Sequence, residues 1–229
     1  MGCAHKHGPA RHLCAAASQD RRLHPLQLLL SLLAPPRCAA CGAACAAADA
    51  LCDRCEKTLR GIPPPPPVQL PALDVAWAAA PHDGVAREMV VALKFRGLLA
   101  VADQIARRIA ERAPPDLLDG AVVPVPPAPS RLWRRGFDPA EAIALRLADL
   151  TRQPVCRCLA RANGPRQVGR SRAVRLAEPP RVRAIRTAPA VAVLIDDVQT
   201  TGATLSACAR ALRDAGAQRV LALTFARTL

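Results

Sequence analysis

Short apolar runs alternate along the chain with stretches in which apolar residues recur at helical spacing. Residues 191–195 and 121–127 are rich in β-branched residues and too short for typical helices, so each predicts a strand buried on both faces of a parallel sheet. Residues 219–225 predict a last strand, residues 73–80 an edge strand, and residues 181–185 a short strand. With helices between them, this alternation predicts an α/β fold, a parallel sheet flanked by helices.

Boundary residues help to place those helices. Residues 85–95 predict a helix that stops at Gly97, and a second helix follows at 98–112. Asp138 is a suitable N-cap for a helix at 139–150, because proline fits the first helical position. A further helix begins near Leu205 and ends before Gly216.

Candidate chemistry follows the run at 191–195. Asp196 and Asp197 come where that strand is expected to end, and a small polar loop precedes the next helix; its residues are Thr200, Thr201, Gly202, Ala203 and Thr204. Ligands of open α/β sheets bind beyond the carboxyl ends of the strands, and free N–H groups at a helix N-terminus attract phosphate. The two carboxylates are placed to accept hydrogen bonds from a diol. A phosphorylated ribose is the simplest ligand that uses every part.

Four cysteines have the spacing of a metal site. Cys38, Cys41, Cys52 and Cys55 form C-x2-C-x10-C-x2-C, which predicts one tetrahedral zinc held by two knuckles of a short zinc ribbon. Four thiolate ligands leave no position for water, so the zinc is expected to be structural. Cys45 either replaces one of the four ligands or remains a free thiol. Metal spacing rather than disulfide spacing favours a reducing compartment, and hence the cytoplasm.

Composition shifts predict the domain organisation. Residues 1–22 are polar and basic and are expected to be disordered, and residues 23–60 are expected to hold a short helix at 23–33 and the zinc ribbon. The apolar residues of that helix also resemble a signal peptide, but prolines and the first cysteine pair follow at once. Residues 61–71 contain five consecutive prolines, which predict a stiff linker to the main domain at 72–229. No stretch reaches the ~18 apolar residues that a membrane span needs.

The net charge of +14 over 229 residues comes almost entirely from arginine. Arginine suits phosphate, so a nucleic acid or diphosphate partner is favoured, although biased base composition of the gene explains the same excess. Candidate diphosphate contacts are Lys94, Arg96, Arg131 and Arg135; the first two could equally be cations that stabilise a helix C-terminus. Residues 157–175 are basic and lack periodicity, which fits either a loop that closes over a diphosphate or a solvated segment.

The stretch from Val191 to Leu205 resembles the PRPP (5-phosphoribosyl-1-diphosphate) motif of type I phosphoribosyltransferases. Residues 26–229 resemble the ComF family of amidophosphoribosyltransferase-like competence proteins. The shared pieces are the four cysteines, Lys94 to Gly97, Pro124 to Pro126, Arg135 to Phe137 with Ala140-Glu141, and Asp196 to Thr204. The chain departs from that family at Asp138-Pro139, where Asn-Gln is usual, and near Leu176, where a phenylalanine is usual.

The resemblance implies a type I phosphoribosyltransferase-like fold in which Asp196 and Asp197 hold the ribose hydroxyls and residues 200–204 bind the 5′-phosphate of PRPP or a related nucleotide. Magnesium would accompany the diphosphate, and an active enzyme would be a pentosyltransferase with an acceptor that the sequence does not reveal. The resemblance also implies an alternative, a non-catalytic competence factor in DNA uptake with single-stranded DNA and an uptake helicase as partners. A third alternative is a regulator that senses PRPP.

Overall fold

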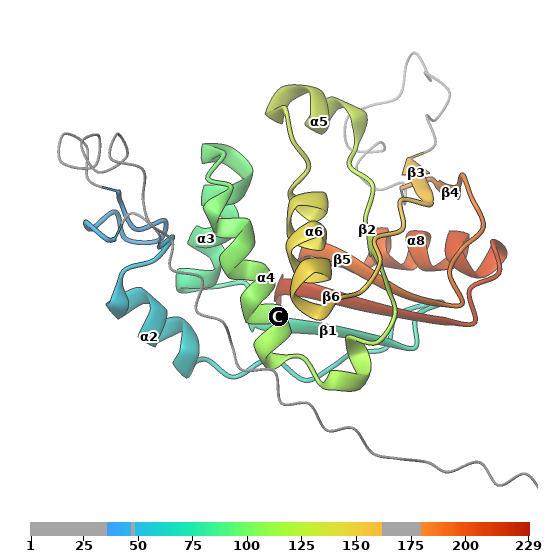
Figure 1. The fold of residues 1–229 in the computed structure, drawn as a ribbon, viewed down its shortest axis with the longest axis horizontal. Coiled ribbons are helices and arrows are strands. Elements are labelled where there is room, and N and C mark those ends of the chain that lie inside the picture. The colour runs from blue at the N-terminus through green and yellow to red at the C-terminus, as the bar shows by residue number, and fades with distance from the viewer. Residues whose placement is uncertain (1–35, 47–48, 162–179) are drawn as a thin grey trace, which may run out of the picture. The chain divides into compact units, whose positions relative to one another are not determined.

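The computed structural model describes residues 36–46, 49–161 and 180–229, which belong to one compact unit, Pro35–Leu229. The predicted disordered segment at 1–22, the predicted helix at 23–33 and most of the basic stretch at 157–175 lie outside these residues. The elements in chain order (Figure 1) are α2 (Asp53–Gly61), β1 (Val75–Pro81), α3 (Gly84–Arg96), α4 (Ala100–Arg112), the 3-10 turn η1 (Pro115–Leu117), β2 (Ala121–Pro124), α5 (Pro129–Arg135), α6 (Pro139–Thr151), β3 (Leu159–Arg161), β4 (Val182–Ala184), β5 (Val191–Gln199), α8 (Ala203–Asp214) and β6 (Arg219–Arg227).

The predicted α/β fold with a parallel sheet is confirmed. Four strands lie in the order β1-β6-β5-β2 and all neighbours run parallel, with β3 and β4 as a separate antiparallel pair. β5 therefore lies inside the sheet, paired with β2 on one side and β6 on the other. An interior parallel strand has both faces covered, which explains its continuous apolar sequence.

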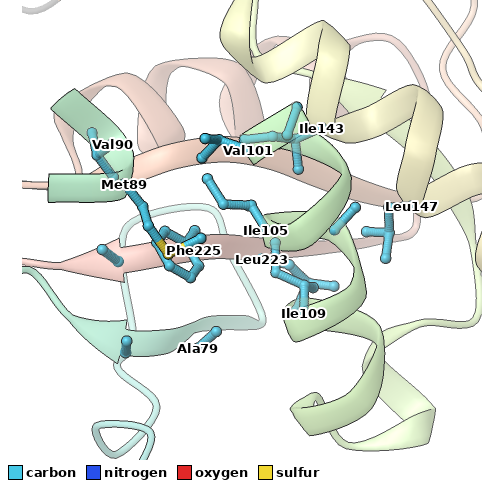
Figure 2. Close-up of a cluster of buried hydrophobic side chains, with 14 of the residues drawn as sticks. Ala79, Met89, Val90, Val101, Ile105, Ile109, Ile143, Leu147, Leu223 and Phe225 are labelled. Carbon is cyan, nitrogen blue, oxygen red and sulfur yellow. The ribbon is translucent and has the colours of Figure 1, made fainter. Parts of the chain in front are cut away.

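Alternate residues of the strands enter two separate cores. Val193 and Ile195 of β5 join Leu223 and Phe225 of β6 in a core with α3, α4 and α6. Figure 2 shows part of this core, in which Met89, Ile105, Ile109, Ile143 and Leu147 surround Leu223 and Phe225. The intervening residues, among them Leu194, Val220 and Ala222, pack instead against α8, whose Leu205, Cys208, Ala209 and Leu212 are buried. Helices thus cover both faces of the sheet.

Several boundaries differ from those expected. β5 does not end at Ile195, because its pairing with β6 continues to Gln199 and places both aspartates within the strand. The short helices α2 and α5 were not predicted, since neither is long enough to show a clear apolar period. The predicted helix stop at Gly97 and the Asp138 cap are both confirmed: Gly97 has a φ of 65°, and the Asp138 side chain accepts a hydrogen bond from the N–H of Ala140.

The cysteine-containing segment packs against α3 and α4. Arg96 donates to the carbonyl of Ala39, and Arg108 donates to the carbonyl of Leu59 at the end of α2. Leu51, Cys55 and Leu59 belong to the same buried cluster as those helices. The proline run that follows carries no helix or strand, and Val68 forms an isolated bridge with Ala76 of β1. Among the described residues, no helix is both long and apolar enough to cross a membrane.

Candidate functional site

The two aspartates of β5 form the floor of the candidate site. Asp197 is buried, with 4% of its surface exposed, and its Oδ1 lies 2.6 Å from Nζ of Lys94 on α3. Asp196 is partly buried, and its Oδ1 accepts a hydrogen bond of 2.9 Å from the N–H of Asp197. One carboxylate is therefore paired with a cation, whereas the other is held by the backbone.

The two aspartates differ in their electrostatic surroundings. Burial raises the pKa of Asp196 to about 8, and the negative charge of Asp197 adds to the rise while Lys94 opposes it. With a pKa of about 8, Asp196 is largely protonated near neutral pH, which reduces the charge repulsion between the two adjacent side chains. The pair can therefore both donate and accept hydrogen bonds, which suits sugar hydroxyl groups.

The loop after β5 leads directly into α8. Gly202 is the N-cap of α8 with a φ of 76°, a conformation that favours glycine, and a Cβ at this position would lie 2.6 Å from Cδ1 of Leu70. The N–H of Ala203 donates to the hydroxyl of Thr201 at 3.3 Å. Two features therefore favour glycine at position 202: the backbone conformation of the turn and the close approach of the Leu70 side chain.

A cavity of about 640 Å³ joins most of the predicted ligand-binding residues. Asp196, Asp197, Thr200 and Thr204 line it together with Lys94, Arg131 and Arg135. Thr201, Gly202 and Ala203 are outside its lining. Arg96 is also outside, because its guanidinium binds the carbonyl of Ala39. The structure therefore brings together acids, hydroxyls and cations from α3, α5, β5 and α8.

Further cavity-lining groups had not been singled out as ligand contacts from the sequence; they are His82, Arg87, Arg134, Asp138 and Arg161. Burial lowers the pKa of His82, and the positive charges of Lys94 and Arg87 lower it further. Burial likewise lowers the pKa of Arg161, whose Nε donates to the carbonyl of Pro126. The local sequence offered weak signals for these residues: a His-Asp-Gly turn, a helix cap and an excess of arginine.

Cationic groups outnumber acids around this cavity. The permanent cations come from α3, α5 and β3; they are Arg87, Lys94, Arg131, Arg134, Arg135 and Arg161. The acidic residues are Asp138, Asp196 and Asp197. An excess of positive charge in a recessed site favours an anionic ligand, and the acids can form hydrogen bonds with hydroxyl groups of such a ligand.

The four predicted metal ligands meet in the structure. The Sγ atoms of Cys38, Cys41, Cys52 and Cys55 all lie within 4.8 Å of one another, with Cys41 and Cys52 at 3.7 Å. This all-thiolate donor set fits a four-coordinate zinc site. Cys52 is the N-cap of α2 and Cys55 lies in its first turn, so a bound ion would fix the start of that helix. Cys45 is outside the cluster, and its thiol donates to the carbonyls of Pro36 and Asp49.

The fold and the cavity define an α/β protein with a polar cavity at the carboxyl ends of its central strands. Comparisons with known proteins do not extend this description: no protein-family model matches the chain, and no curated protein matches it.

Proposed function

We propose that this protein is a phosphoribosyltransferase-like protein that binds PRPP or a related ribose phosphate in the cavity above β5. The observation that carries the proposal is the joint presence of Asp196, Asp197, Thr200 and Thr204 with Lys94, Arg131 and Arg135 around one cavity. PRPP presents a diol, a monophosphate and a diphosphate.

Each part of that ligand has chemically suitable partners here. The carboxyl groups of Asp196 and Asp197 form hydrogen bonds with the ribose hydroxyls, and the first turn of α8 offers N–H and threonine hydroxyl groups to the 5′-phosphate. Lys94, Arg131 and Arg135 offset negative charge on the diphosphate as it leaves. Magnesium bound together with PRPP would supply Lewis-acid stabilisation of the same diphosphate. Structural zinc at the four cysteines would support the fold.

The test is calorimetry of the full chain with PRPP and magnesium, followed by a diphosphate-release assay with a panel of nucleobases. We expect binding by the wild type and at least about tenfold weaker binding by Asp197→Asn, which loses a charged hydrogen-bond acceptor. Asp214→Asn, at the exposed end of α8, is the matched control and should bind normally. Unchanged binding by Asp197→Asn would refute the assigned role of this carboxylate. Binding without diphosphate release would favour a PRPP sensor.

A second candidate function is binding of single-stranded DNA, and one specific observation favours it. The chain has five aromatic residues, and two of them are strongly exposed: Trp133 is 90% exposed on α5 and Phe95 is 67% exposed at the end of α3. The guanidinium of Arg135 lies 5.4 Å from the centre of the Phe95 ring. Exposed rings beside arginines can stack bases while the cations contact phosphates.

Filter binding of a labelled oligothymidine at several salt concentrations tests this second function. Phosphate contacts predict that affinity falls steeply as salt rises. Trp133→Ala should weaken binding about tenfold through lost stacking, whereas Leu229→Ala, which removes another exposed apolar side chain, should have no effect. Affinity that is independent of salt, or equal in wild type and Trp133→Ala, would count against a DNA-binding surface on α5.

A further inference from the structure

Asp138 is a carboxyl group that lines the same cavity as the two aspartates of β5. It immediately precedes α6, and the cavity that it lines also contains Asp196, Asp197 and Arg135. Its Oδ1 accepts a hydrogen bond of 3.0 Å from the N–H of Ala140. A carboxylate accepts about four hydrogen bonds, so this cap leaves capacity for a ligand.

The surroundings of Asp138 suit proton transfer near neutral pH. Burial raises the pKa of Asp138 to about 6, backbone N–H groups of Ala140 and Glu141 oppose the rise, and the charges of Glu141 and Asp197 add to it. Asp196 and Arg135 also interact with it electrostatically. A base with a pKa slightly below the working pH is both ionised and able to accept a proton efficiently.

We propose that Asp138 is the general base that deprotonates the acceptor during phosphoribosyl transfer, an inference that rests on the function proposed above. The acceptor carries an N–H or O–H group. Its nitrogen or oxygen forms a bond to the anomeric carbon of PRPP as the bond from that carbon to the diphosphate oxygen breaks. The electron pair leaves with the diphosphate, and the acceptor proton passes to the carboxylate of Asp138.

The capping role of Asp138 can be separated from a catalytic role. Asparagine caps a helix about as well as aspartate, but it cannot take up a proton under these conditions, so Asp138→Asn should preserve α6 and remove the base. Asp83 provides a matched control, because its side chain caps α3 through a 2.7 Å hydrogen bond from Gly84 and does not line the cavity. Asp83→Asn therefore makes the same chemical change in a cap outside the site.

The experiment compares wild type, Asp138→Asn and Asp83→Asn in two measurements on the full chain. Calorimetry measures PRPP binding in the presence of magnesium, and a diphosphate-release assay with water and a panel of purine and pyrimidine bases measures turnover from pH 5 to pH 8. We expect Asp138→Asn to bind PRPP at least as tightly as the wild type, because it removes a negative charge from an anion site. Its diphosphate release should fall at least about 100-fold.

The pH profile distinguishes a base from a structural residue. In the wild type, kcat/KM should rise with pH through about 6 as Asp138 loses its proton. Asp138→Asn should lose this rise, and Asp83→Asn should retain both the rise and the rate. If Asp138→Asn released diphosphate at the wild-type rate, the inference would be overturned. PRPP binding by the wild type without any diphosphate release would also overturn it. Absence of PRPP binding by the wild type would overturn the proposed function itself and the inference with it.

Discussion

Nζ of Lys94 lies 2.6 Å from Oδ1 of Asp197, so an ion pair between α3 and β5 crosses the floor of the candidate site. The Asp197 side chain is 6% exposed and that of Lys94 is 22% exposed. Water therefore screens this pair less than the exposed pairs on the surface. The pair also compensates the charge of a carboxylate that would otherwise repel phosphate.

Replacing Lys94 should disturb both stability and ligand binding. Lys94→Gln leaves the buried carboxylate of Asp197 without its cation, and we expect a loss of about 1–3 kcal/mol in the free energy of unfolding. Urea denaturation measures this loss, and calorimetry should show weaker PRPP binding. Arg107→Gln is the control, because it breaks an exposed i,i+4 pair with Asp103 and should cost less than about 0.5 kcal/mol. Equal effects of the two substitutions would contradict the special role of the buried pair.

Asp196 should make stability depend on pH. Its pKa is raised from 3.8 in the reference state to about 8, so the folded protein holds a proton that the unfolded chain releases. The resulting stabilisation is complete below about pH 4 and is lost as the pH rises to about 8. We expect Asp196→Asn to become more stable relative to the wild type from pH 5 to pH 8, by at most about 1.4 kcal/mol per pH unit. Urea denaturation across this range measures the free energy of unfolding of both proteins. A difference between them that does not change with pH would contradict this prediction.

The cysteine cluster should bind one zinc ion per chain. Cys41→Ser removes one of the four thiolates, and we expect it to lower the metal content and the Tm, because bound metal stabilises the folded segment directly. Cys45→Ser should retain zinc, since the Cys45 thiol is bonded to backbone carbonyls outside the cluster. Elemental analysis of purified protein and thermal unfolding with and without a chelator measure both effects. Zinc loss in Cys45→Ser comparable to that in Cys41→Ser would instead make Cys45 a ligand.

Gly202 should tolerate no side chain. Gly202→Ala forces a residue with a Cβ to adopt a φ of 76° and places that Cβ 2.6 Å from Leu70, so we expect a loss of about 1–3 kcal/mol in the free energy of unfolding. Gly61→Ala is the control, because nothing lies within 4 Å of a Cβ at that position and alanine favours a helix. Urea denaturation should therefore show a lower free energy of unfolding for Gly202→Ala and an unchanged or higher one for Gly61→Ala. Leu70→Ala combined with Gly202→Ala should recover only the part of the loss that is due to the steric clash.

Features that depend on neighbours in the sequence were predictable from it. The apolar run at 191–195, the threonine-rich loop after it and the C-x2-C spacing each follow from local backbone geometry, and the structure places them in a strand, a helix N-terminus and a metal-sized cluster. The Asp138 cap and the Gly97 stop are local for the same reason. The sequence alone therefore determined the α/β character and the residues at the edge of the sheet where a ligand is expected.

Only the tertiary structure decided which distant side chains meet. The strand order β1-β6-β5-β2 and the packing of α3 against the sheet bring Lys94 to Asp197, and neither follows from residue spacing. Arg96, only two positions after Lys94, points instead to Ala39, because successive helical residues face different directions. Asp138 lines the same cavity and Trp133 is exposed. Both placements likewise depend on how α5 and α6, which follow β2 in the chain, pack in the folded protein. Local sequence fixes the conformation of a segment, whereas side-chain contacts across the cavity depend on the packing of segments that are far apart in the chain.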